Sequence, residues 1–158
     1  MTRCYIGLGS NLADPAGQLR SALNAMAEIA HTRLIESSPF YTSAPVGPGE
    51  QPDYVNAVAA LDTDLSAEAL LDALQAIENA HGRERTVRWG ARTLDLDVLL
   101  FGNHTLATDR LSVPHPRIPE RNFVLVPLAD VAPDLVMPDG TPLHALLDQC
   151  PANRLHRL

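Results

Sequence analysis

Lysine is absent from this chain, and all 12 of its basic residues are arginine. A P-loop needs a lysine after its glycines and a protein kinase needs one on a strand, so neither nucleotide-binding scheme is available. No stretch approaches the ~18 consecutive apolar residues of a membrane span, and the first residues lack the apolar core of a signal peptide. The only two cysteines, Cys4 and Cys150, lack metal-ligand spacing, so we expect a reducing, cytoplasmic location.

Acidic residues exceed basic ones, giving a net charge of −7, which argues against a general nucleic-acid binder. At 158 residues, 46% of them hydrophobic, the chain is expected to form one domain over residues 1–158. The arginines are nevertheless concentrated in one part of the sequence. That part contains Arg83, Arg85, Arg88, Arg92, Arg110, Arg117 and Arg121. A basic cluster on an acidic protein indicates a compact anionic ligand.

Hydrophobic periodicity and capping residues predict a βαββαβ order of elements. Asp14 and Ser66 are the expected helix N-caps, with Pro15 at the first position of the first helix. The second helix is expected to stop near Gly82. The expected strands are 3–8, 33–42, 54–61 and 94–101, and a short helix is expected over 121–131. This order predicts an α+β, ferredoxin-like sandwich of helices on an antiparallel sheet, with an irregular C-terminal extension.

The most informative segment lies in the last of these strands, where two carboxylates interrupt an apolar run. In a strand, Asp95 and Asp97 would share one face ~7 Å apart, with residues 94, 96, 98 and 100 on the other. Like charges so placed destabilise a sheet unless a cation lies between them, and Mg²⁺ prefers carboxylate and phosphate oxygens. A merely solvated strand face is the alternative, but it would not require the nearby arginines, whose guanidinium groups match phosphate. The segment therefore predicts a Mg²⁺–nucleotide site.

Several further motifs accompany this segment in a fixed order. Together they make residues 5 to about 140 resemble the 6-hydroxymethyl-7,8-dihydropterin pyrophosphokinase family of folate biosynthesis, which also has a ferredoxin-like core. The motifs are Gly9–Leu12, Tyr41–Gly47, Gln51–Ala57, Arg88–Phe101, Val113–Arg117 and Glu120–Leu128. Ala91 stands where the family commonly has proline, and the stretch from Gly82 to Trp89 is shorter than in some relatives.

The resemblance implies transfer of a pyrophosphoryl group from ATP to the hydroxymethyl group of the dihydropterin, with release of AMP. Asp95 and Asp97 would hold two Mg²⁺ ions that bridge the triphosphate, and Arg92 and Arg121 would contact the oxygens of the transferred group. These four residues form the implied catalytic set. The implied partners are ATP and the pterin, with no nucleic acid and no membrane, and a monomer is expected.

The resemblance also assigns residues to each substrate. On the pterin side, Asn56 offers a donor and an acceptor to the ring edge, and Tyr54 and Phe123 would sandwich the ring. Groups around Ser43, Ala44 and Val46, largely of the backbone, would complete that pocket. The residues implied at the nucleotide are Glu78, Arg83, Arg85, Trp89, Arg92, Val98, Arg110, Ser112, His115 and Arg121.

Two other functions are compatible with the same sequence features. A nucleic-acid-binding module can use a ferredoxin-like fold, although the negative charge opposes it. A metal-dependent phosphohydrolase could use the same aspartates, but it would need no aromatic pair for a flat second substrate.

Overall fold

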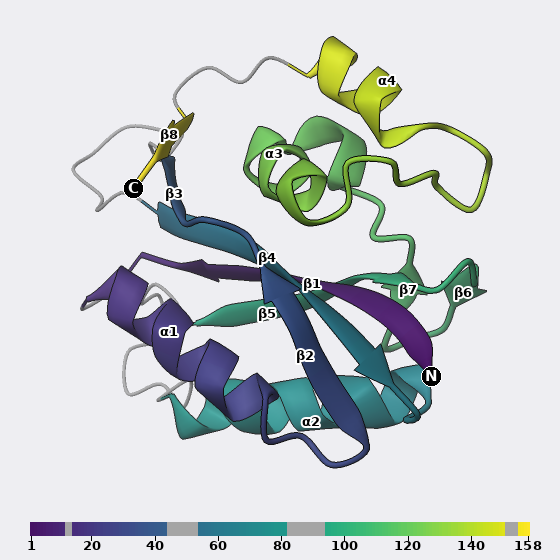
Figure 1. Cartoon of the computed structure of the whole chain (residues 1–158). Coiled ribbons are helices and arrows are strands. Elements are labelled where there is room, and N and C mark those ends of the chain that lie inside the picture. Colours follow the sequence, from purple (N-terminus) through teal and green to yellow (C-terminus); the bar gives the residue numbers. More distant parts are fainter. Residues whose placement is uncertain (12–13, 44–53, 82–93, 151–154) are drawn as a thin grey trace.

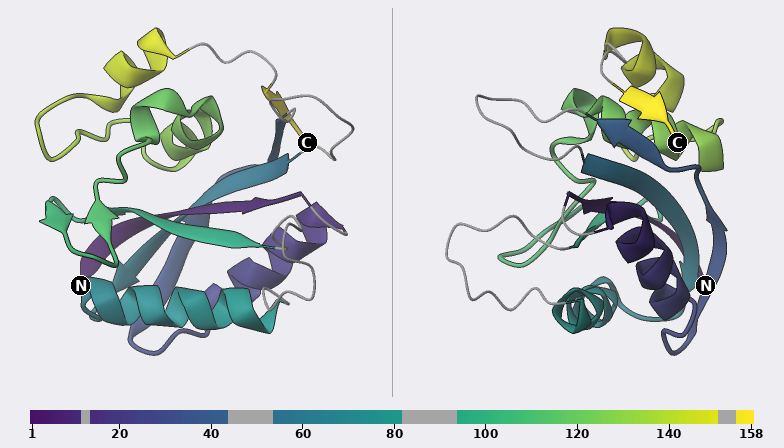
Figure 2. Two further views of the ribbon diagram at one scale, coloured as in Figure 1. Left: turned by 180° about the vertical axis from the view of Figure 1, so that it is seen from behind. Right: turned by 90° about the vertical axis from the view of Figure 1, so that its left-hand side faces the viewer.

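The computed structural model describes residues 1–11, 14–43, 54–81, 94–150 and 155–158. A twisted antiparallel sheet lies at its centre, with α1 and α2 on one face and α3 on the other, where α4 packs on α3 (Figure 1). Figure 2 shows the same layers from two further sides. Each face of the sheet has its own apolar core. None of the helices in this described part is long and apolar enough to cross a membrane.

The elements follow the predicted ferredoxin-like order, β1-α1-β2-β4-α2-β5, with β3 inserted before β4. The sheet order is β5-β1-β4-β3-β8, and β2 also pairs with β4. The strands of this sheet are β1 Thr2–Ser10, β2 Thr32–Ser37, β3 Tyr41–Ser43, β4 Tyr54–Thr63, β5 Asp95–Phe101 and β8 Leu155–Arg157. The helices are α1 Pro15–Met26, α2 Ala67–Ala80, α3 Asn122–Val131 and α4 Leu143–Gln149. A small hairpin of β6 Leu106–Ala107 and β7 Ser112–Val113 and a 3₁₀ turn, Ile118–Glu120, connect β5 to α3.

Both predicted helix caps are confirmed. The Asp14 carboxylate accepts a hydrogen bond from the Gly17 N–H at 3.3 Å, and the Ser66 hydroxyl accepts one from the Ala69 N–H at 3.1 Å. Each side chain thus satisfies one of the N–H groups that a helix leaves without a partner in its first turn.

The strand expected over 33–42 is divided in two. β2 pairs with residues 59–63 of β4, and β3 pairs with residues 54–56. Between them, the Ser38 N–H donates to the Val58 carbonyl at 2.8 Å, and the Ser38 hydroxyl accepts from the Val58 N–H at 3.0 Å. The next residue, Pro39, has no N–H with which to continue a ladder. Ser38 therefore maintains contact with β4 across the break.

One expectation for β5 is wrong. Leu94, Leu96 and Val98 pack in the core beneath α1 and α2, as predicted, but Leu100 packs with Leu99 in the core beneath α3. The cause is a shift in the register between β5 and β1 at this point, which adds one residue to β5. Such a bulge reverses the alternation of faces beyond it. The reversal starts after Asp97 and leaves the two aspartates on a common face.

The C-terminal part of the chain contains more regular structure than expected, because α4 and β8 lie within it. β8 pairs with β3, and the Tyr41 hydroxyl of β3 donates a hydrogen bond to the Asp130 carboxylate of α3. Burial and this hydrogen bond raise the pKa of Tyr41 to about 12. This hydrogen bond links α3 to β3, the strand that pairs with β4 at Asn56.

Candidate active site

The strand register places the predicted metal and pterin residues on one face of the sheet. Asp95 of β5 is directly opposite Gly9 of β1, which is opposite Asn56 of β4, which is opposite Tyr41 of β3. Directly paired residues project to the same face. Two strand spacings separate Asp95 from Asn56, about 10 Å. A glycine between them leaves that stretch of the face without a side chain.

The strand that carries the aspartates is fixed to α2 by a buried carboxylate. Glu78 is 4% exposed and accepts a hydrogen bond from the Leu96 N–H at 2.9 Å. Leu96 lies between Asp95 and Asp97 on β5, which is an edge strand of the sheet formed by the described residues, so its outward N–H groups face no neighbouring strand there. Glu78 was assigned to the nucleotide by resemblance, and the structure gives it a contact with the backbone between the two aspartates.

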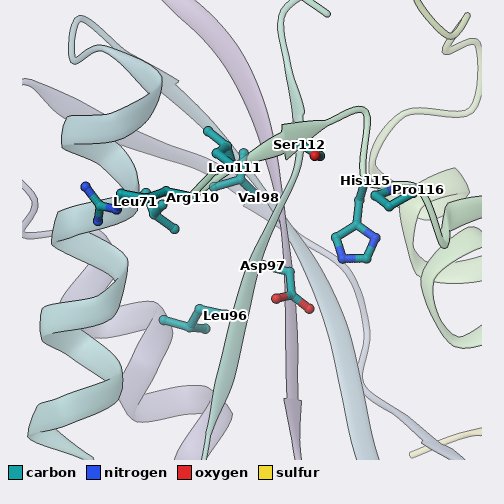
Figure 3. Close-up of a pocket in the computed structure, with 9 residues that line it drawn as sticks. All are labelled: Leu71, Leu96, Asp97, Val98, Arg110, Leu111, Ser112, His115 and Pro116. Carbon is teal, nitrogen blue, oxygen red and sulfur yellow. The ribbon is translucent and has the colours of Figure 1, made fainter. Parts of the chain in front are cut away.

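An open cavity of about 280 Å³ lies along the outer edge of β5 (Figure 3). The Asp97 carboxylate and the His115 ring lie on one side of the strand, and the Leu96 side chain points the other way, toward α2. Four of the ten residues predicted at the nucleotide line this cavity. Its lining residues are Leu71, Leu96, Asp97, Val98, Arg110, Leu111, Ser112, His115 and Pro116.

His115 is held in one orientation by two backbone hydrogen bonds. Its N–H donates to the Leu99 carbonyl at 2.9 Å, and its ring Nδ1 accepts from the Arg117 N–H at 3.1 Å. In the neutral ring the proton is therefore on Nε2. Burial, together with the positive charges of Arg121 and Arg117, lowers the pKa of His115 and outweighs the opposing effect of Asp97. The ring can thus donate a hydrogen bond without carrying charge.

Arg110 lies at the α2 end of the cavity and is engaged by acidic and amide side chains of that helix. Its guanidinium contacts Asp72 at 2.5 Å, Gln75 at 3.2 Å and Glu68 at 3.9 Å. The hydrogen bond to Asp72 raises the pKa of Arg110. Ser112, which was also predicted at the nucleotide, is exposed on β7 at the same cavity.

The predicted pterin residues lie on β3, β4 and α3, beyond this cavity. The Ser43 hydroxyl donates a hydrogen bond to Asn56 Oδ1 at 3.1 Å, and Asn56 is 8% exposed. Tyr54 is directly opposite Ser43 and half-buried. Phe123 lies in the first turn of α3, and the Arg121 guanidinium lies 5.6 Å from the centre of its ring. The positive charge of Arg121 also lowers the pKa of His115.

Several predicted residues lie outside the described part of the chain. They are Ala44, Val46, Arg83, Arg85, Trp89 and Arg92. The described residues contain no group of three acidic, histidine or cysteine side chains arranged for a metal ion. Asp95 and Asp97 nevertheless offer the hard oxygen donors that Mg²⁺ prefers, and Mg²⁺ commonly takes only one or two carboxylates beside phosphate oxygens.

The sequence did not predict the position of Gly9, which stands just after the expected strand 3–8 and begins the motif Gly9–Leu12. It lies within β1, between Asp95 and Asn56. A signal was present, because a glycine inside a strand often marks a close approach of another group to the backbone. The pairing of Tyr41 with Asp130 had no local signal.

Comparisons with known proteins show the family of this chain. A family model for 7,8-dihydro-6-hydroxymethylpterin-pyrophosphokinase (HPPK) matches residues 5–133. The 2-amino-4-hydroxy-6-hydroxymethyldihydropteridine pyrophosphokinase of Pseudomonas aeruginosa is 56% identical over 99% of this chain and 96% of its own length. The protein of the same name from Haemophilus influenzae is 49% identical, over 100% of this chain and 99% of its own.

Solved structures show the same fold at low identity. An HPPK-DHPS protein of Plasmodium falciparum superposes with a TM-score of 0.75 and 13% identity, covering 94% of this chain. Another HPPK-DHPS structure, in complex with substrates, gives a TM-score of 0.72 at 12% identity. This chain spans 45% of each of those longer chains.

Proposed function

Because this chain belongs to the 7,8-dihydro-6-hydroxymethylpterin-pyrophosphokinase family, we propose that the face bearing Asp95, Asp97 and Asn56 is its active site. The protein is an ATP-dependent pyrophosphokinase of folate synthesis. It transfers pyrophosphate from ATP, its co-substrate, to the hydroxymethyl group of 6-hydroxymethyl-7,8-dihydropterin. The observation that carries the site assignment is the direct register from Asp95 through Gly9 to Asn56.

The nucleotide half of the proposed site lies at β5. Asp95 and Asp97 would hold two Mg²⁺ ions, which when bound would neutralise much of the triphosphate charge. The cavity along β5 supports this assignment, because Asp97, Ser112 and His115 all line it. The neutral His115 would donate from Nε2 to a nucleotide oxygen, and Arg110 would act at the α2 end of the cavity.

The pterin half lies at β4 and the start of α3. The Asn56 amide would recognise the donor and acceptor edge of the pterin, and Tyr54 and Phe123 would stack on the ring. The spacing of about 10 Å between Asp95 and Asn56 suits two substrates that meet between them, over β1. Backbone groups near Ser43, Ala44 and Val46 remain proposed parts of this pocket.

The reaction takes place where the two halves meet. The hydroxymethyl oxygen attacks the β-phosphorus of ATP and releases its proton to solvent, the bond to the α,β-bridging oxygen breaks, and AMP leaves with that oxygen. The charge of Arg121 lowers the pKa of His115, and its guanidinium lies 5.6 Å from the centre of the Phe123 ring, which supports a role for Arg121 at the proposed transfer point. Guanidinium groups stabilise the charge of a transferring phosphoryl group. Arg83, Arg85, Trp89 and Arg92 are proposed to complete the nucleotide side.

The wider organisation of the protein is also proposed. Residues 1–158 are proposed to form one pyrophosphokinase domain, because β3 and β4 contact both α3 and the rest of the sheet. Small molecules are its proposed partners, with neither nucleic acid nor membrane, and the proposed state is a monomer in the cytoplasm.

Product analysis tests the function directly. The purified protein is incubated with ATP, Mg²⁺ and 6-hydroxymethyl-7,8-dihydropterin. The nucleotide and pterin products are then separated and identified by mass spectrometry. AMP that forms only with pterin, together with a pterin diphosphate, is the expected result. ADP with phosphate would instead indicate a kinase or a hydrolase. Asn56→Ala tests the site assignment: it should raise KM for the pterin and leave ATP affinity nearly unchanged, whereas equal losses for both substrates would contradict it.

A further inference from the structure

We infer that Gly9 and Ser43 are positioning residues that hold the Asn56 amide from its two sides and so set the enzyme's affinity for the pterin. Ser43 holds the amide oxygen from β3, and Gly9 provides the space over β1 in which the amide nitrogen lies. The inference rests on the proposed role of Asn56. It gives a function to the Ser43 side chain and to the lack of a side chain at Gly9.

Gly9 is required for space rather than for backbone conformation. The described glycines with positive φ are Gly102 and Gly140, so alanine could adopt the backbone of Gly9 without strain. A Cβ added to Gly9 would nevertheless lie 3.0 Å from Asn56 Nδ2, closer than an ordinary van der Waals contact. The amide nitrogen therefore lies directly over Gly9, toward the strand that separates it from Asp95.

Ser43 limits how the amide can respond. Its hydroxyl donates to Asn56 Oδ1 at 3.1 Å, and Nδ2 lies on the opposite side, over Gly9. A methyl group at residue 9 would push the nitrogen away from β1, while Ser43 still held the oxygen. The amide could accommodate both only by turning out of its present plane.

The consequence concerns substrate recognition. With Oδ1 on the β3 side, the N–H groups of Nδ2 lie over β1, where they could donate to acceptors of the pterin. The second lone pair of Oδ1 remains for a donor of the pterin. A pterin presents neighbouring acceptors and donors on its pyrimidinone edge, so it can pair with an amide in one orientation only. Loss of one such hydrogen bond weakens binding by roughly 3–10-fold.

The first test compares alanine at two glycines of the same strand and face. Gly9→Ala should weaken pterin binding by roughly 3–10-fold, measured by calorimetry with a non-hydrolysable ATP analogue and Mg²⁺ present. Gly7→Ala is the matched control, because its Cβ would lie 3.4 Å from the nearest Leu99 side-chain atom and would not meet Asn56. Affinity for the ATP analogue should be unchanged in both. Equal effects of the two substitutions on pterin binding would overturn the inference.

A double-mutant cycle separates positioning from general damage. In an Asn56→Ala background, Gly9→Ala should cause no further loss of pterin affinity, because the amide that it displaces is gone. An undiminished Gly9→Ala effect there would refute the inference. Ser43→Ala should weaken pterin binding and Ser43→Thr should restore it, since threonine retains the hydroxyl. An Asn56→Ala protein with normal pterin affinity would instead refute the proposed role of Asn56 itself.

Discussion

The Glu78 carboxylate of α2 accepts a hydrogen bond from the backbone N–H of Leu96, the residue that separates Asp95 from Asp97. Glu78 is buried, and its contact joins α2 to β5 at the residue between the two proposed metal ligands. Glu78 thus helps to hold the backbone that carries the two carboxylates, and it need not contact the nucleotide to do so.

Glu78→Ala is expected to lower the free energy of unfolding by about 1–3 kcal/mol, because it leaves the buried Leu96 N–H without an acceptor. It should also lower kcat/KM for ATP through the altered position of the aspartates. Glu78→Gln retains an acceptor oxygen and should recover most of the stability. Urea unfolding measures the effect, with Asn79→Ala, exposed on the same helix, as the control. Unchanged stability in Glu78→Ala would contradict the prediction.

Asp97→Ala should lower kcat by ~10² or more, because it removes a major electrostatic contribution at the triphosphate. Removal of Mg²⁺ with a chelator should abolish turnover by the unmodified enzyme, and added Mg²⁺ should restore it. Steady-state kinetics at several Mg²⁺ concentrations checks both results. Asp148→Asn, on the exposed side of α4, is the control and should be unaffected. Near-normal turnover in both Asp95→Ala and Asp97→Ala would exclude the proposed metal site.

His115 should make the protein less stable in mild acid. Its folded-state pKa is lowered, chiefly by burial, below the value near 6.5 of an unfolded histidine. The stabilising contribution of the neutral ring is therefore present above about pH 6.5 and is lost as the pH falls through the folded-state pKa. Unfolding measured between pH 7.5 and 5 should show a smaller decline for His115→Asn than for the unmodified protein. Identical declines would rule out this contribution.

Tyr41 should have the corresponding effect in alkali. Its pKa is raised to about 12, so its contribution to stability is complete below the unfolded-state pKa near 10 and is lost as the pH rises through 12. Tyr41→Phe removes the hydrogen bond to Asp130 and should cost about 1 kcal/mol at pH 8. Between about pH 10 and 12 the unmodified protein should lose this advantage, so the two stability curves should converge. Parallel curves would show that the pair contributes nothing to the alkaline dependence.

Much of the fold was predictable because its signals are local. Asp14 and Ser66 mark the helix starts through hydrogen bonds that span three residues. Alternation along 94–98 placed Asp95 and Asp97 on one face, since side chains of a strand alternate strictly. The same rule failed at Leu100, where an irregular pairing with β1 reverses the faces. The hydrogen bonds that span the break between β2 and β3 likewise join Ser38 to Val58 of another strand, so neighbouring residues give no signal of them.

The sequence by itself determined the family, the order of elements and the presence of two carboxylates on one strand face, because motif spacing and strand alternation are properties of neighbouring residues. Only the tertiary structure decided that Glu78 binds the backbone between those carboxylates and that Gly9 separates Asp95 from Asn56. These relationships join residues far apart in the chain, and their distances are set by strand pairing and by the packing of helices on the sheet.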